Sequence, residues 1–171
     1  MNLILCGMMG CGKTTIGRKI AEITSRRCLD TDDLIVEKYG KITDIFARYG
    51  EGYFRDIETA IVREVAQKDR LIVSTGGGLV LKSENVALLR KNGKIVYLRA
   101  KKETLEERLK ADKDRPLLQS GESLSDRLKE LLKVRAPIYE SVADYVVSVD
   151  EKTPDEIATE IVGLTALTDR K

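Results

Sequence analysis

Residues 7–14 of the chain read GMMGCGKT and decide the fold. They match the P-loop pattern G-x-x-x-x-G-K-[ST] at every position. The apolar run 2–6 precedes them and is typical of a buried parallel strand. Residues 15–24 follow, with Ile16, Ile20 and Ile23 spaced as on one helix face. This order of strand, glycine loop and helix is the context in which the motif binds a nucleotide.

The chemistry of phosphate binding explains the residue types in this loop. Glycines let the backbone turn tightly and bring several N–H groups against one phosphate. The helix N-terminus adds a partial positive charge. Lys13 places a compact charge on the β- and γ-phosphates, and the Thr14 hydroxyl is the right length to ligate a magnesium ion that bridges them. The alternative is an ordinary glycine turn before a helix. Nucleotide binding is favoured because both the residues of the motif and the strand and helix that flank it agree with a P-loop.

Composition limits the class of protein. A chain of 171 residues with 42% hydrophobic and 34% charged residues suits one well-buried domain, residues 1–171. The formal net charge of +2 gives no general attraction to nucleic acid or membranes. No apolar run is as long as a membrane span, and the N-terminus lacks the basic start of a signal peptide.

Cysteine and histidine usage narrows the chemistry. Cys6, Cys11 and Cys28 are odd in number and lack metal-type spacing, which indicates a reducing cytoplasm. The chain contains no histidine. A general base must therefore be a carboxylate, a lysine or a water, and Ser-His or His-metal mechanisms are excluded.

Short apolar runs alternate with helical patterns, which predicts an α/β fold with a parallel sheet covered on both faces. Pro137 should kink its helix or end it early, and the tail after Leu164 should fray. A capping box at Thr153 opens the last helix. The expected strands are 2–6, 27–30, 71–74, 94–98 and 145–149, and the other expected helices are 15–24, 34–39, 43–49, 53–67, 83–91, 102–110 and 124–139.

Ligands of parallel sheets bind at the carboxyl ends of the strands. Asp30 and Asp32 follow the second strand, so one could hold water on the magnesium while the other accepts a hydrogen bond from a substrate hydroxyl. The alternative is a helix N-cap with an acidic first turn. Residues 76–78 are three glycines directly after a buried strand, and they allow a ligand to approach the backbone closely.

Residues 112–123 are polar and aperiodic, which predicts a mobile lid that closes over ATP. Arg115 lies in this lid, Arg55 on helix 53–67 and Arg135 on helix 124–139. Any one arginine is ordinarily a solvated surface charge. Beside a P-loop, however, the guanidinium forks of all three suit carboxylate and phosphate oxygens.

Together these motifs resemble the shikimate kinase family, over residues 2–162. The P-loop alone is shared by many families, whereas the full set in this order is far more specific. The matching residues are the P-loop through Thr15 with Gly17-Arg18, Asp30-Thr31-Asp32, Ile45-Phe46, Gly50-Glu51, Phe54-Arg55 with Glu58, Thr75-Gly76-Gly77-Gly78, Arg115-Pro116-Leu117-Leu118, and Arg135 with Tyr139.

The resemblance implies a three-layer α/β/α fold like that of nucleoside monophosphate kinases, with five parallel strands ordered 2-3-1-4-5. It implies transfer of the ATP γ-phosphoryl group to the 3-hydroxyl of shikimate, a step toward chorismate and the aromatic amino acids. Mg²⁺ would be the cofactor, with ATP as co-substrate. We expect a cytoplasmic monomer with no nucleic-acid or membrane partner, since nothing in the sequence suggests an obligate interface.

The resemblance also implies residue roles, with an acceptor-binding region at about 31–60. Cys11 stands where a smaller residue is commoner in the family, and it could make the enzyme thiol-sensitive. The implied catalytic residues are Lys13, Asp32 and Arg115; the ATP-binding residues are Gly10, Cys11, Gly12, Lys13, Thr14, Thr15, Arg108, Arg115, Thr153 and Pro154; the shikimate-binding residues are Asp32, Arg55, Gly76, Gly77, Gly78 and Arg135; and the magnesium residues are Thr14 and Asp30.

Three other interpretations stay open at this point. Another small-molecule kinase, such as a gluconate or nucleotide kinase, would place different acceptor contacts at Arg55 and at residues 76–78. A GTPase would use Asp-x-x-Gly and Asn-Lys-x-Asp motifs, which the chain lacks. A nucleotide-binding module without catalysis would have no reason to combine a lid, acids and arginines. Consumption of ATP that requires an acceptor separates these classes.

We predict that Lys13→Ala or Lys13→Met destroys turnover and leaves the fold intact, because the change removes only the charge that faces the phosphates. The measurement is kcat beside a far-ultraviolet circular dichroism spectrum. Normal kcat with an unchanged spectrum would contradict the role given to Lys13.

Overall fold

The computed structural model describes residues 1–111 and 123–167. Arg115 and residues 112–122 of the predicted lid lie outside the described residues. Residues 168–171 do so as well.

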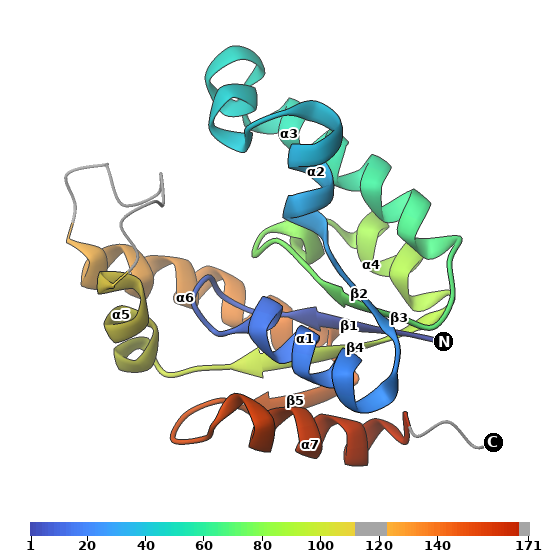
Figure 1. The fold of residues 1–171 in the computed structure, drawn as a ribbon. Coiled ribbons are helices and arrows are strands. Elements are labelled where there is room, and N and C mark those ends of the chain that lie inside the picture. The colour runs from blue at the N-terminus through green and yellow to red at the C-terminus, as the bar shows by residue number, and fades with distance from the viewer. Residues whose placement is uncertain (112–122, 168–171) are drawn as a thin grey trace.

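Five parallel strands form one sheet in the order β2-β3-β1-β4-β5 (Figure 1), which confirms the predicted fold class and strand order. All five predicted strands form, with small differences at the ends of β4 and β5. Their bounds are β1 Asn2–Cys6, β2 Arg27–Asp30, β3 Leu71–Ser74, β4 Gly93–Arg99 and β5 Tyr145–Ser148.

Helices cover both faces of this sheet. The step from β1 to β2 runs toward one edge of the sheet, and all later steps run toward the other edge. Because such crossovers are right-handed, α1 lies on one face while α4 and α6 lie on the other; α7 packs on α1 (Figure 1). The helices are α1 Lys13–Thr24, α2 Thr31–Tyr39, α3 Ile42–Ala66, α4 Ser83–Arg90, α5 Lys102–Lys110, α6 Leu124–Val142 and α7 Pro154–Thr165, with a 3₁₀ turn η1 at Leu79–Leu81. Within the described residues, no helix combines the length and the apolar character needed to cross a membrane.

The central strand β1 sets the position of the site. All 5 of its residues are buried, as the continuous apolar run predicts. It pairs with β3 on one side and with β4 on the other. Because the strands are parallel, Cys6, Asp30 and Ser74 end at the same edge. The P-loop, α2 and the glycine turn therefore all begin there.

The buried face of α1 differs from the predicted one. Ile16 and Ile20 are buried, but Ile23 is 52% exposed. The buried arc takes in Gly17 and Thr24 instead. A Cβ built on Gly17 would lie 3.2 Å from a cysteine sulfur of β2, so the missing side chain lets α1 approach the sheet on that side. This close approach turns Ile23 toward solvent.

The first two helices after β2 also differ from their predicted bounds. α2 begins earlier because the Asp30 carboxylate caps it, accepting a hydrogen bond from the backbone N–H of Asp32 at 2.9 Å. The predicted helices 43–49 and 53–67 both form within α3, one on each side of Gly50. The non-helical φ of 81° and ψ of 177° at Gly50 separate them by a kink, as predicted.

Pro137 does not end α6, so the prediction of an early end is wrong. A proline inside a helix removes a hydrogen bond and crowds the preceding turn, at a cost of about 3 kcal/mol. Tertiary contacts hold the helix beyond it. Tyr139 is buried, and Arg90 Nη2 donates to the carbonyl of Val142 at 2.8 Å.

Residues 165–167 do not show the fraying predicted after Leu164, and the rest of that tail lies outside the described residues. Ala166 turns the chain with a φ of 48°, in the left-handed conformation that commonly ends helices. The turn brings Leu167 into the core, where it is 1% exposed. An apolar contact just after the helix therefore fixes the end of α7.

We predict that Ile20→Ala lowers the free energy of unfolding by about 2–5 kcal/mol, because it leaves a cavity between α1 and the sheet. Ile23→Ala is the matched control, and it should change stability by no more than about 0.5 kcal/mol. Urea unfolding of both variants measures the difference. An equal loss of unfolding free energy in both variants would show that Ile20 is no more buried than Ile23.

Candidate active site

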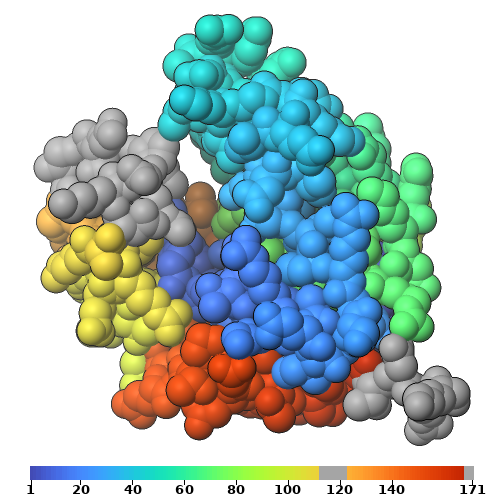
Figure 2. Space-filling model, in the orientation of Figure 1, coloured from blue at the N-terminus to red at the C-terminus, as the bar shows by residue number. Residues whose placement is uncertain are grey.

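A cleft of about 1340 Å³ opens at the carboxyl edge of the sheet. The P-loop, α2, α3, the turn after β3, α5, α6 and the start of α7 form its walls, and Lys13, Thr14 and Thr15 line it. Figure 2 shows the surface hollowed between the light-blue and cyan residues of α2 and α3 and the yellow residues of α5. Pockets for one small molecule measure roughly 300–1,000 Å³, so this cleft has room for two.

The P-loop has the backbone shape of an anion-binding loop. Gly10 and Gly12 have φ of 81° and 96°, in the left-handed region that glycine tolerates best. The Lys13 ammonium donates to the carbonyls of Gly7 at 2.8 Å and Met8 at 3.0 Å. α1 begins at Lys13, so the positive end of its dipole faces the same place. An ammonium group and a helix N-terminus thus converge on the mouth of the loop.

The Cys11 side chain faces the interior of the P-loop. It is 0% exposed, its Sγ lies 3.8 Å from Lys13 Nζ, and its backbone N–H donates to the carbonyl of Met8 at 3.2 Å. Contact with ATP would therefore fall to the backbone of Cys11. A thiol this buried is shielded from reagents, so the structure does not favour thiol sensitivity.

Thr14 and Asp30, the two residues predicted to serve magnesium, are in direct contact. Thr14 Oγ1 donates to Asp30 Oδ2 at 2.7 Å and lies 3.3 Å from Ser74 Oγ. The other carboxylate oxygen, Asp30 Oδ1, caps α2. Asp30 thus serves as the N-cap, one of the two alternatives left open by the sequence, and still presents an oxygen beside the P-loop. Ser74 was not among the site residues predicted from the sequence.

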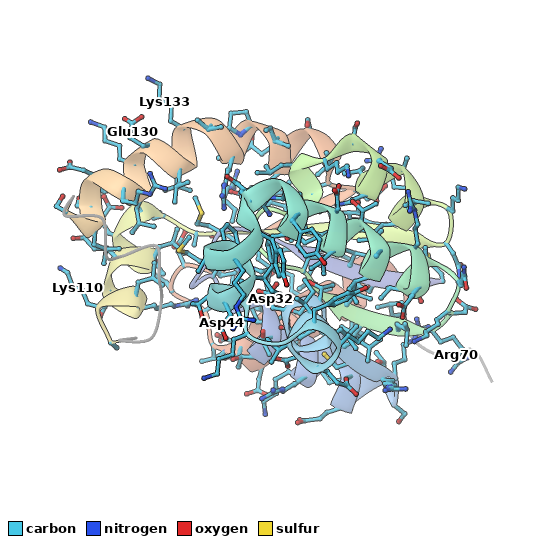
Figure 3. All side chains as sticks on the ribbon, turned by 90° about the horizontal axis from the view of Figure 1, so that it is seen from above. Asp32, Asp44, Arg70, Lys110, Glu130 and Lys133 are labelled. Atoms are coloured by element: carbon cyan, nitrogen blue, oxygen red, sulfur yellow. The ribbon has the colours of Figure 1, made fainter. Side chains whose placement is uncertain are left out.

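The glycine turn packs closely against two residues predicted to bind the phosphoryl acceptor, Asp32 and Arg55. A Cβ built on Gly76 would lie 2.7 Å from Asp32 Oδ1, and one on Gly78 would lie 2.3 Å from Arg55 Nη1. Any larger residue at either position would displace a side chain of the site. Figure 3, a view from above, shows Asp32 near the middle of the molecule. Asp32, Arg55 and the turn therefore form one wall of the cleft.

Two carboxylates of α3 hold the Arg55 guanidinium. Nη1 donates to Glu58 at 2.8 Å and Nη2 donates to Glu51 at 3.2 Å. Glu58 is only 1% exposed; burial raises its pKa, and the hydrogen bond from Arg55 acts against that rise. For Arg55, burial lowers the pKa, but the bonds to both carboxylates outweigh it and leave the pKa raised. Arg55 is therefore a permanent charge in a fixed position, as anion recognition requires.

Arg135 reaches the same turn from α6. A Cβ built on Gly77 would lie 3.4 Å from Arg135 Nη1. One turn further along α6, the Tyr139 hydroxyl donates to the Gly77 carbonyl at 2.6 Å. Arg55 and Arg135 therefore lie close to consecutive glycines of the turn and line one cleft, as the sequence predicts.

The residues predicted near the adenine divide into two groups. Arg108 and Pro154 line the cleft, and Arg108 Nη1 donates to the Gly10 carbonyl at 3.3 Å, which ties α5 to the P-loop. The Thr153 side chain does not line the cleft among the described residues. It accepts a hydrogen bond from the backbone N–H of Glu156 at 3.2 Å, within the capping box of α7.

Arg127, a further cation of the cleft, was not predicted from the sequence. It lies on α6, about two turns before Arg135, and lines the same cavity. A lone arginine on a polar helix is ordinarily a surface charge. The only sequence feature that pointed to Arg127 was its helical spacing from Arg135, which places the two side chains on similar sides of α6. Glu58 was noted as part of a motif, but its burial beneath Arg55 could not be seen in the sequence.

A P-loop after the central strand, with a second binding wall that carries arginines, defines a P-loop kinase that acts on a small molecule. Comparison with known proteins gives the family. A model of the shikimate kinase family matches residues 9–165. A shikimate kinase of Caldicellulosiruptor bescii is 42% identical over 164 residues, which make up 95% of this chain and 94% of that relative.

Solved structures similar to this chain point to the same family. The shikimate kinase of Acinetobacter baumannii in complex with shikimate has a TM-score of 0.91 at 38% identity, covering 99% of this chain and 95% of that one. The shikimate kinase of Bacteroides thetaiotaomicron has a TM-score of 0.89 at 31% identity, covering 97% and 98%. The chain therefore belongs to the shikimate kinase family and is an ATP-dependent kinase.

We predict that the KM for the acceptor rises as the pH falls toward the raised pKa of Glu58, because protonation removes the charge that holds Arg55. Glu58→Gln cannot titrate, so it should start from a higher KM and lack this part of the pH dependence. The measurement is KM between about pH 5 and 8 for both proteins.

Ionisation of the acceptor itself affects both proteins equally, so the difference between the two profiles isolates Glu58. Profiles that run parallel over the whole range would show that Glu58 does not control Arg55.

Proposed function

We propose that the chain transfers the γ-phosphoryl group of ATP to the 3-hydroxyl of shikimate, giving shikimate 3-phosphate and ADP. The observation that carries this proposal is the meeting of a P-loop, two aspartates and two arginines in one cleft. The cleft holds a phosphate-binding side and a carboxylate-binding side. One domain, residues 1–171, would contain both sides, with the acceptor region at about 31–60.

Mg²⁺ is part of the proposal, because the residues present fit it. Magnesium sites in kinases use one or two protein oxygens and complete the shell with water and substrate phosphates. Thr14 Oγ1 and Asp30 Oδ2, 2.7 Å apart beside the P-loop, supply such oxygens. When bound, the ion would neutralise charge on the β- and γ-phosphates.

The nucleotide side would bind ATP through charge and backbone N–H groups. Lys13 would bind the β- and γ-phosphates and neutralise charge that develops on the transferred group. Arg115, which lies outside the described residues, is proposed to contact the same phosphates. Thr15 would continue the phosphate contacts at the start of α1. Arg108 and Pro154 line the part of the cleft proposed for the adenine.

The acceptor side would orient shikimate by its carboxylate. The guanidinium forks of Arg55 and Arg135 would take that carboxylate, and the backbone of residues 76–78 would support the ring. Asp32 would contact the reacting hydroxyl and accept its proton late, because the transition state of phosphoryl transfer is loose. Positioning and charge neutralisation would supply most of the rate acceleration.

Further parts of the proposal concern the context of the reaction. We propose that the enzyme is a cytoplasmic monomer whose partners are ATP and shikimate, without nucleic acid or membrane. Three free cysteines, Cys6, Cys11 and Cys28, are in keeping with a reducing compartment.

The experiment that tests the function is a coupled ADP-release assay against a panel of hydroxy acids, sugars and nucleoside monophosphates. ADP release should require shikimate and stay at background with gluconate or nucleotides. Turnover that favours a gluconate or nucleotide acceptor would support another small-molecule kinase. ATP consumption without any acceptor would refute the proposed acceptor site.

We predict that Asp32→Asn lowers kcat by roughly 10²–10⁴, the range typical of a general base, because the amide keeps the shape but cannot take a proton. A loss at the low end would suit a proton that leaves late. Asp30→Asn, the matched control two residues away, should mainly raise the Mg²⁺ requirement. The measurement is a magnesium titration of both variants.

Rescue by excess Mg²⁺ distinguishes the two aspartates. Rescue of Asp30→Asn alone is the expected result. If excess Mg²⁺ rescued Asp32→Asn and not Asp30→Asn, the two roles would have to be exchanged.

A further inference from the structure

The Tyr139 hydroxyl has no role in the proposed reaction, yet it lies between two acceptor-binding elements. Tyr139 is 0% exposed, and its ring packs against Tyr97 with centroids 5.1 Å apart. Its hydroxyl donates to the Gly77 carbonyl at 2.6 Å, at the short end of the range for such bonds. A directed hydrogen bond, and not packing alone, therefore fixes this side chain.

Arg135 approaches the same glycine, since a Cβ built on Gly77 would lie 3.4 Å from Arg135 Nη1 and 3.7 Å from the Tyr139 hydroxyl oxygen. Burial raises the pKa of Tyr139 well above its ordinary value, while the positive charge of Arg135 acts against that rise. The two residues are one turn apart on the same face of α6. Because the phenol proton goes to the Gly77 carbonyl while the Arg135 guanidinium lies beside the same glycine, both side chains of α6 meet the turn at Gly77.

The hydrogen bond from Tyr139 to Gly77 fixes the direction of a backbone N–H. The peptide bonds of the described residues are all trans, and in a trans peptide the C=O and N–H groups point in opposite directions. Since the Gly77 carbonyl points at Tyr139, the Gly78 N–H points away from it. Within residues 1–111 and 123–167 that N–H has no hydrogen-bond partner, and Gly78 lines the cleft.

Other hydrogen bonds hold the turn from the side of the sheet. The Gly76 N–H donates to Thr31 Oγ1 at 2.9 Å, and Thr75 Oγ1 donates to the Leu5 carbonyl at 3.0 Å. Neither bond reaches α6. Among the described side chains, Tyr139 makes the hydrogen bond that ties the turn to the helix carrying Arg135.

We propose that Tyr139 is a positioning residue for the acceptor, whose hydroxyl holds the Gly77–Gly78 peptide in a fixed position beside the Arg135 guanidinium of the same helix. A carboxylate-bearing acceptor then meets a cation and a backbone donor that are already aligned, which saves the entropy of ordering them. The choice of shikimate as the acceptor rests on the proposed function. The alignment itself belongs to the protein and can be measured without turnover.

The kinetic test compares Tyr139→Phe with Tyr97→Phe. Each variant removes one hydroxyl from the same buried ring pair, and only the first removes a bond to the turn. Tyr139→Phe should raise the KM for shikimate about three- to tenfold, the factor expected for one net hydrogen bond. The KM for ATP should stay unchanged, and Tyr97→Phe should leave both KM values unchanged. An equal rise of both KM values, or the same effect from Tyr97→Phe, would overturn the proposal.

The spectroscopic test follows the amide resonance of Gly78 in ¹⁵N-labelled protein. In the free protein, Tyr139→Phe should move this resonance while that of Gly163 in α7 stays in place. Addition of shikimate should shift the Gly78 resonance strongly in the wild type and weakly in the variant. A Gly78 resonance that is unchanged by Tyr139→Phe in the free protein would overturn the proposal.

Two further provisions keep the test decisive. If Tyr139→Phe does not fold, Tyr139→Met fills much of the same volume without a hydroxyl, and the same results are expected. If wild-type protein shows no turnover with shikimate, the proposed function fails. The Gly78 resonance of the free protein then still decides whether Tyr139 sets the peptide.

Discussion

The pairing of β1 between β3 and β4 is the constraint on which the rest of the structure depends. Leu5 pairs with Ser74 and with Val96, so the strands end at matching heights. The chain leaves β1 into the P-loop and leaves β3 into the glycine turn at the same edge. Both strands are buried on both faces, so a slip of one residue would exchange the side chains packed on each face of a close-packed core. This packing locks the two substrate sides together. The position of the acceptor wall relative to the phosphate loop is thus fixed by the core.

Several polar groups of the cleft are held by hydrogen bonds from other groups of the protein. Glu58 accepts a hydrogen bond from Arg55, Asp30 accepts one from Thr14, and Tyr139 donates one to the glycine turn. These partners fix the direction of charges and donors before any substrate arrives. Charges that are already fixed need no reorganisation during phosphoryl transfer. Such sites gain most of their rate acceleration from this preorganisation. The missing side chains of Gly76 and Gly78 provide the space in which Asp32 and Arg55 can lie against the backbone.

Local patterns predicted much of this arrangement. The P-loop, the parallel strands and the capping box of α7 depend on neighbours in the sequence, and all three are confirmed. The errors arise where contacts with residues distant in the sequence determine which side chains are buried and where a helix ends. Ile23 has the right spacing for burial, but the contact of Gly17 with β2 turns α1 away from it. α6 continues through Pro137 because packing outweighs propensity. The P-loop drew attention to Arg55 and Arg135, and the resemblance gave them their roles and added Glu58. The burial of Glu58 and the placing of Arg127 in the cleft follow only from the packing of α3 and α6.

The most direct measurement is coupled ³¹P and ¹H nuclear magnetic resonance of the products formed from ATP and shikimate by the wild-type enzyme. We expect one phosphate ester whose phosphorus couples to the proton on carbon 3 of shikimate. That ester should form in step with ADP and only when shikimate is present. Release of inorganic phosphate with ADP and no ester, or an ester on another hydroxyl, would contradict the account.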